Sequence, residues 1–173
     1  TGNKHLLSTR WNQVFSAARK KARTVGFEAA VAGAVPIVSG LRTGLAANSI
    51  RSVIGIFNGT TNYILSRMAH EGCELGTALA EAQRLGMAER VPTMDLNGSD
   101  TAHKISILAS LFAGAWVRPE IVSREGIANV EADDIRFAVE KLGRTVRLLG
   151  TAAMRAKSAV EAHVQPTLVP LKH

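Results

Sequence analysis

Apolar side chains along this chain recur at the spacing typical of helices, and that spacing predicts six helical segments. These helices cover 8–24, 37–46, the stretch from the turn at 58–61 to about 71, about 76–85, 100–114 and 131–142. In the first of these, Ser8 or Thr9 supplies the N-terminal cap, and Gly26 follows the end. Its apolar face consists of Trp11, Val14, Phe15 and Ala18, and basic residues fill the other face.

Shorter apolar runs with β-branched residues predict strands between these helices. They cover Phe27–Ala32, Ile50–Phe57, and a final pair over 144–153 and 158–164 that forms a hairpin or two neighbouring strands. Residues 87–99, with Pro92, Asn97 and Gly98 as turn formers, predict a loop. Because strands and helices mix without strict βαβ alternation, the pattern favours an α+β fold over a doubly wound sheet.

Composition places this pattern in a globular protein. The chain has 173 residues, of which 46% are hydrophobic, enough for one domain with a sizeable core. No apolar run approaches the roughly 18 residues that a membrane helix needs, and the first residues do not form a signal peptide. A single cysteine, Cys73, indicates a reducing compartment, so we expect a cytoplasmic protein. Both ends of the sequence are abrupt, which indicates a piece of a larger fold.

The excess of basic residues raises an alternative function. The net charge is +7, with Arg19, Lys20, Lys21 and Arg23 clustered in one predicted helix. Such a surface is compatible with a nucleic-acid-binding module. Aromatic residues make up only 5% of the chain, however, which leaves few side chains on which bases could stack. A charge run is more often a solvated helix face, so nucleic-acid binding is the less favoured hypothesis.

The strongest candidate for a catalytic group lies in the predicted helix that holds Asp100 and Lys104. At 100° per residue, both fall on the side of the leucines, away from His103 and the serines. A lysine shielded from water and paired with an acid one turn earlier can act as a general acid–base. The alternative is an ordinary ion pair with the lysine reaching to solvent, and spacing alone favours that alternative.

Two further patterns border this helix. Glu89 and Asp95 precede Asp100, and such a group of carboxylates could bind an amino group, a metal ion or only water. The turn Asn58-Gly59-Thr60-Thr61 places backbone N–H groups at a helix start, which suits a carboxylate or phosphate but is a weak signal alone. A dinucleotide-binding Gly-x-Gly-x-x-Gly turn does not occur in the sequence.

Taken together, several segments resemble the homoserine dehydrogenase family in content, order and spacing. The segments are TGNK at 1–4, FEAAVAGAVPI at 27–37, GIFNGTTNYIL at 55–65, AQRLGMAE at 82–89, PTMDLNGSDTAHK at 92–104, EGI at 125–127 and PTLVPL at 166–171. The resemblance implies the reduction of L-aspartate 4-semialdehyde to L-homoserine with NADP or NAD. It also implies a mixed, largely antiparallel sheet with helices packed on one face, and a homodimer or higher oligomer.

The resemblance also assigns residues to the reaction. It implies that Lys104 donates the proton to the aldehyde oxygen and that Lys4 lies near the nicotinamide and the substrate. Glu89 and Asp100 are implied to hold the substrate amino group and to orient the lysine, with Asp95 nearby as a further substrate-binding residue.

Further implied roles concern the turn and a metal. Gly59 and Thr60 match the substrate-contacting turn. The Glu28 carboxylate and the carbonyls of Val31, Gly33 and Val35 match a monovalent cation site, usually sodium. Two departures from the family pattern are Arg90-Val91, where an acidic contact is lost, and Met87, which replaces a frequent tyrosine.

In domain terms, the resemblance implies that residues 1–26 are the trailing edge of a nucleotide-binding domain. Residues 27–173 are then a catalytic and dimerisation domain, incomplete at its C-terminal end. We therefore expect the isolated polypeptide to be inactive for lack of a cofactor domain. A non-catalytic remnant that only dimerises is the alternative from a different functional class.

Overall fold

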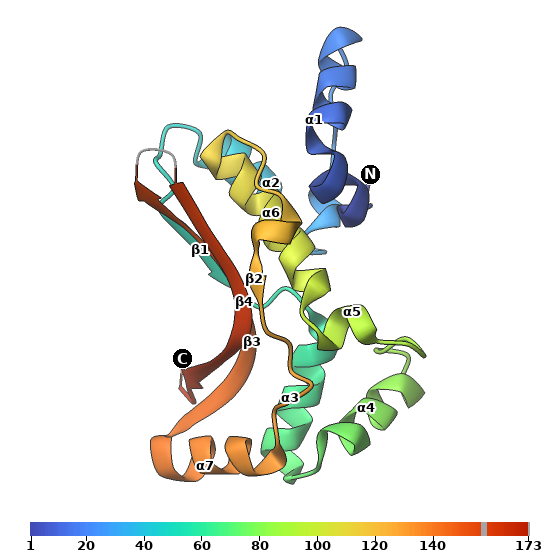
Figure 1. Ribbon diagram of the computed structural model, residues 1–173, viewed down its shortest axis with the longest axis vertical. Coiled ribbons are helices and arrows are strands. Elements are labelled where there is room, and N and C mark those ends of the chain that lie inside the picture. Colours follow the sequence, from blue (N-terminus) through green and yellow to red (C-terminus); the bar gives the residue numbers. More distant parts are fainter. Residues whose placement is uncertain (157–158, 173) are drawn as a thin grey trace. The chain divides into compact units, whose positions relative to one another are not determined.

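The computed structural model of the chain describes residues 1–156 and 159–172, and its helices and strands are mixed along the sequence (Figure 1). The chain packs as two units, each built from three segments. Unit 1 consists of Thr1–Phe57, Ala102–Ser123 and Gly150–His163. Unit 2 consists of Asn58–Thr101, Arg124–Leu149 and Val164–His173.

A cluster of apolar side chains forms the core of unit 1. Leu7 of α1 (Lys4–Lys20) and Ile107 and Leu108 of α6 (Ser99–Ala113) are fully buried in it. The cluster also contains Val38 of α2 (Ile37–Ser39), while Val53 of β1 (Ser52–Gly55) packs against it. The face of β1 that carries Val53 is therefore the face covered by α6.

Helix α1 begins four residues earlier than the sequence predicted. Asn3 is the cap, because its side-chain oxygen accepts a hydrogen bond from the backbone N–H of Leu6 at 2.9 Å. The predicted caps Ser8 and Thr9 lie inside the helix, where their hydroxyls donate to the carbonyl of His5. The helix ends at Lys20, ahead of the predicted end, so both predicted boundaries were wrong.

The predicted strand over Phe27–Ala32 was also wrong. Glu28–Ala30 form a single 3₁₀ turn. Phe27, Ala30 and Val31 are all buried in the unit 1 core, so neighbouring residues point inward together instead of alternating. An apolar run of this length does not distinguish a strand from a buried turn.

The predicted helix over 37–46 corresponds to α2 and one π-helical turn at Gly40–Gly44.

Within the described residues, the sheet has four strands in the order β1-β3-β4-β2, and β1 pairs antiparallel with β3. Ser52 lies opposite Ala153, and Gly55 opposite Gly150. Strands β3 (Arg144–Ala156) and β4 (Ala159–Pro170) extend further than the two strands predicted at the end of the chain, and β2 (Ser123–Arg124) was not predicted. The predicted start of the last strand, 158, lies outside the described residues. The mixed architecture of helices and a sheet is confirmed.

Unit 2 is built around α3 (Gly59–Glu71), which contacts α4 (Leu75–Arg84), α5 (Thr93–Leu96) and α7 (Ala132–Leu142) (Figure 1). The predicted helices 76–85 and 131–142 are thus confirmed to within a residue, and so is the predicted end, near 71, of the helix that follows the turn at 58–61. The predicted loop 87–99 contains α5, so that prediction was wrong in part. α3 and α7 end on Gly72 and Gly143, whose left-handed backbone (φ 64° and 62°) terminates a helix readily.

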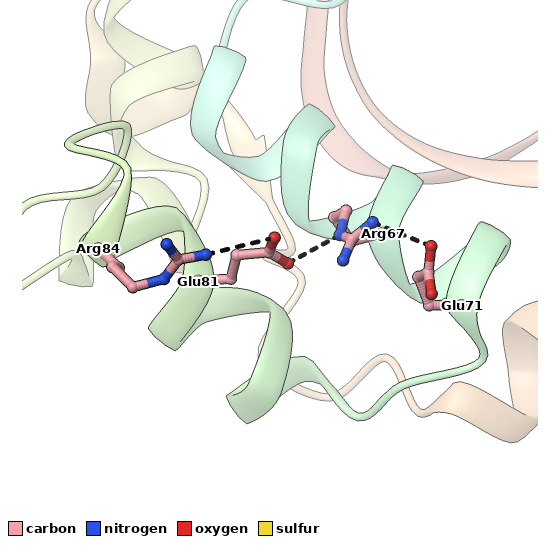
Figure 2. A network of polar contacts seen from close by, with 4 residues as sticks. All are labelled: Arg67, Glu71, Glu81 and Arg84. Atoms are coloured by element: carbon pink, nitrogen blue, oxygen red, sulfur yellow. Dashed lines mark hydrogen bonds and ion pairs between the residues drawn. The ribbon is translucent and has the colours of Figure 1, made fainter.

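A network of charged side chains joins α3 to α4 (Figure 2). Arg67 Nε lies 2.8 Å from Glu81 Oε2, and Arg67 Nη1 lies 3.0 Å from Glu71 Oε1. Arg84 approaches the other oxygen of Glu81 at 3.9 Å. The hydrogen bond with Glu81 raises the pKa of Arg67 above its ordinary value.

Gly126 brings the segment before α7 into direct contact with α5. The backbone N–H of Ile127 donates to the carbonyl of Leu96 at 2.8 Å. A Cβ atom at Gly126 would lie 1.9 Å from that carbonyl oxygen and 2.5 Å from the Cα of Asn97. Only glycine allows the two backbones to approach this closely, and the contact holds α5 and its residue Asp95 in place.

Candidate functional site

Lys104 lies half-buried on α6, within unit 1. Its Nζ donates a hydrogen bond to the backbone carbonyl of Phe57 at 2.6 Å. Its neighbour on the helix, Ile105, and Leu108 one turn later are fully buried. The ammonium group is therefore held against the main chain two residues beyond β1.

The opposite side of α6 has a structural role. Ser106 Oγ donates to the carbonyl of Val117 at 2.6 Å, and Ser110 Oγ accepts from the Val117 N–H at 2.9 Å. His103 Nδ1 lies 2.8 Å from Ser8 Oγ on α1, and its ring contacts that of His5 edge-on. The polar face of α6 is thus buried against protein, and its side chains satisfy backbone groups and tie α1 to α6.

In unit 2, the side-chain amide of Asn58 brings two of the predicted acids together. Asn58 Nδ2 donates to Asp95 Oδ1 at 2.6 Å and to Asp100 Oδ2 at 2.9 Å. Its Oδ1 accepts from the backbone N–H of Thr61 at 2.8 Å and so caps α3. Asn58 and Asp100 are each only 5% exposed. The sequence predicted Asp95 and Asp100 but missed Asn58, whose only signal was its place in a capping turn.

The surroundings of Glu89 differ from those of Asp95 and Asp100, because its side chain is exposed to solvent. The loop that carries it is fixed through its backbone, since Gln83 Nε2 donates to the carbonyl of Glu89 at 3.1 Å. Thr60 Oγ1 donates to the carbonyl of Met87 at 2.7 Å. The predicted substrate turn at Gly59 and Thr60 is therefore tied to the loop that holds Glu89.

The Glu28 carboxylate, predicted as a cation ligand, closes the start of α2 in unit 1. Its two oxygens accept hydrogen bonds from the backbone N–H groups of Val38 and Ser39 at 2.7 and 2.8 Å. Burial pushes the pKa of Glu28 upward, but these hydrogen bonds outweigh it and hold the pKa below the ordinary value of 4.5. The anionic form is therefore favoured.

The other predicted cation ligands are backbone carbonyls in the loop after Glu28. The carbonyl of Val35 accepts from the N–H of Ile37 at 2.8 Å, while Val31 is buried and Gly33 exposed. Carbonyl and carboxylate oxygens are the ligands that hard cations prefer, so the donor types fit such an ion. Groups of three or more His, Cys, Asp or Glu side chains able to hold a metal are absent from the described residues.

Lys4, the other predicted catalytic residue, is the first residue of α1 and is half-buried in unit 1.

The helices in the described part of the chain are too short or too polar for any of them to cross a membrane.

Comparisons with known proteins agree on one family. The family model described as homoserine dehydrogenase matches residues 36–173. The homoserine dehydrogenase of Neisseria gonorrhoeae is 45% identical over 170 residues, covering 98% of this chain and 39% of that protein. That of Pseudomonas aeruginosa is 44% identical over 170 residues, with the same coverage. The crystal structure of a homoserine dehydrogenase from Thiobacillus denitrificans superimposes with a TM-score of 0.94 at 46% identity, over the whole of this chain and 40% of that one.

Proposed function

The chain belongs to the homoserine dehydrogenase family, and we propose from this that it supplies the substrate-binding and proton-donating residues of such an enzyme. The chain spans about 40% of the length of the relatives it matches, so the activity proposed is that of the whole enzyme. The reaction is the NAD(P)H-dependent reduction of L-aspartate 4-semialdehyde to L-homoserine, a precursor of threonine, methionine and isoleucine.

The observation that carries the proposal is the half-buried ammonium group of Lys104, fixed on the Phe57 carbonyl. A nicotinamide cofactor would supply the hydride that adds to the aldehyde carbon. As that bond forms, the electron pair of the C=O π bond moves to the oxygen, which becomes negative. The Lys104 ammonium stabilises this charge and transfers a proton to the oxygen, which completes the alcohol.

The acidic residues of unit 2 suit the amino group of such a substrate. Its amino group is cationic, and the carboxylates of Asp95 and Asp100, brought together by Asn58, form a ready acceptor pair. Glu89 adds a further negative charge from the neighbouring loop. The start of α3 at Gly59 and Thr60 presents backbone N–H groups and a positive helix end, which suit the substrate carboxylate.

The described residues do not form the phosphate-binding site that a nicotinamide cofactor needs. The sequence has no glycine-rich turn for its phosphates, and β1 and β3 run antiparallel where a dinucleotide fold needs parallel strands. We assign only Lys4 to the cofactor, as a residue near the nicotinamide and the substrate by family resemblance. For this reason we expect the 173-residue chain on its own not to oxidise NADPH or NADH.

We further propose a cytoplasmic enzyme that forms a homodimer or higher oligomer and holds one monovalent cation, sodium by family resemblance. The donor types at this loop, the Glu28 carboxylate and backbone carbonyls, support the cation, and the single cysteine supports the compartment.

A hybrid enzyme tests the proposed activity. Residues 1–173 replace the corresponding part of the Neisseria gonorrhoeae relative, and NADPH consumption is measured with L-aspartate 4-semialdehyde. We expect turnover, and we expect Lys104→Met to lower kcat by about 10²- to 10⁴-fold, the usual contribution of a general acid. Lys104→Arg should be similarly impaired, because a guanidinium keeps its proton.

Lys141→Met provides the matched control, since Lys141 is an exposed lysine in the last turn of α7. Its hybrid should keep full activity. A folded hybrid without turnover would refute the proposal and favour the dimerisation-only alternative, and full activity of Lys104→Met would refute the role of Lys104.

A further inference from the structure

One buried amide, that of Asn58, joins α3, α5 and the first turn of α6 within unit 2. It caps α3 through Thr61, and it donates to Asp95 on α5 and to Asp100 in the first turn of α6. The partners lie 37 and 42 residues further along the chain. A cap alone needs only an acceptor oxygen, and the two donor bonds go beyond that requirement.

The orientation of this amide is determined by its partners. In the orientation present, the oxygen faces an N–H group and the nitrogen faces two carboxylates. The opposite orientation would set the amide oxygen against two acceptors and the NH₂ group against a donor, which leaves three contacts unfavourable. Asn58 therefore acts as a fixed double donor.

A double donor solves a problem that two neighbouring carboxylates create. Like charges close together repel each other, and without a partner between them the side chains turn apart or one takes up a proton. Hydrogen bonds from an amide to ionised carboxylates are strong and directional. Each carboxylate oxygen has more than one lone pair, so a carboxylate that accepts from Asn58 can also accept from a substrate ammonium.

We propose that Asn58 is a positioning residue that fixes Asp95 and Asp100 for the ammonium group of the substrate. This inference rests on the proposed function, because it presupposes an amino acid as substrate. Asn58 itself does not contact the substrate. It acts through the two carboxylates, and it thereby sets the preference for substrates that carry an amino group.

The variant Asn58→Ser separates this role from helix capping. Serine caps a helix nearly as well as asparagine, so α3 should be retained. Its hydroxyl is too short to bond both carboxylates, so the tie between α5 and α6 is lost. Asn129→Asp is the control for an unrelated change at an exposed asparagine of the same unit.

In the hybrid enzyme, the measurement is oxidation of L-homoserine and of 4-hydroxybutanoate, the same alcohol without the amino group. We expect Asn58→Ser to lower kcat/KM for homoserine by about 10- to 100-fold, chiefly through KM. With 4-hydroxybutanoate, kcat/KM should stay within about twofold of the parent. Equal losses for both compounds, or none for homoserine, would overturn the proposal.

A second measurement uses the 173-residue chain and needs no activity. The NMR signals of the Asn58 side-chain amide should move in Asp95→Asn and in Asp100→Asn, because each change replaces a carboxylate that accepts a hydrogen bond from this amide. An amide signal that responds to neither change would overturn the proposal. If the parental hybrid oxidises neither alcohol, the proposed function fails, and the NMR result alone then decides whether Asn58 holds the two acids.

Discussion

Glu28 illustrates how a single side chain serves more than one structural demand. The family resemblance singled it out as a cation ligand, while the structure uses both of its oxygens to close the start of α2. These uses are compatible, because each carboxylate oxygen can accept a second partner beside its N–H donor. The N–H groups favour the charged form that a cation would also require.

Stability in acid should depend on this residue. The pKa of Glu28 is lower in the folded chain than its ordinary value of 4.5, so the unfolded chain binds a proton at higher pH than the folded one. Its stabilising contribution is complete above the unfolded pKa and is lost as the pH falls through the folded pKa. We expect Glu28→Gln to lower Tm at neutral pH, with the difference from the parent vanishing in acid. Calorimetry at several pH values measures it, and a constant difference would contradict the explanation.

The proposed cation gives Glu28 a second, separable signature. If sodium binds the folded chain there, replacing choline chloride by sodium chloride at equal ionic strength should raise the parental Tm, because a ligand of the native state stabilises it. Glu28→Gln should abolish the rise. A rise of equal size in both chains would show that sodium acts elsewhere.

At the scale of elements, the sequence predicted long periodic helices well and short elements poorly. α3, α4 and α7 followed from apolar spacing and from glycines such as Gly86 and Gly143 after their ends. The turn at Glu28–Ala30 and the one-turn helix α5 are shorter than the period that would reveal them. Asn58 was missed for a related reason: its bonds to Asp95 and Asp100 depend on tertiary packing, which local patterns do not contain.

The pairing of α3 with α4 should weaken without Glu81. Glu81→Gln removes the charge that faces both Arg67 and Arg84, and leaves Arg67 with Glu71 on its own helix. Because the side chains are partly exposed, we expect a small fall in Tm, which shrinks at high salt as the parental ion pairs are screened. Glu74→Gln, just before α4, serves as the control. A large, salt-independent loss would show that packing and not charge is responsible.

The close approach at Gly126 predicts a larger effect. Gly126→Ala places a Cβ atom against the Leu96 carbonyl at 1.9 Å, so the backbone must move. We expect a loss of about 1–3 kcal/mol in the free energy of unfolding, the usual range for overpacking. Gly76→Ala, whose Cβ would have no neighbour within 4 Å, should be neutral or slightly stabilising. Urea unfolding of both variants measures this, and equal stabilities would contradict the prediction.

At the scale of the whole molecule, the family was within reach of the sequence because its motifs keep their order over the chain. The arrangement of the sheet was not, because strand pairing joins residues such as Ser52 and Ala153 that lie about a hundred positions apart. The net charge of +7 suggested a second function, yet charge says nothing about which side chains lie together. The sheet also raises the question of assembly.

Strand β1 lies at one end of the strand order, with Val53 facing α6 and Ile54 on the opposite face, where it is 63% exposed. Ile56, two residues on, is 46% exposed. An edge strand with exposed isoleucines invites pairing with another chain.

We therefore expect the 173-residue chain to form dimers through the face of β1 that carries Ile54, as the proposed oligomer requires. Ile54→Lys should shift it to monomer in light scattering. Phe137→Lys, a change at a similarly exposed residue of α7, should leave the dimer intact. A dimer that persists in Ile54→Lys and dissociates in Phe137→Lys would place the interface on α7 instead, because a buried lysine weakens whichever surface the second copy covers.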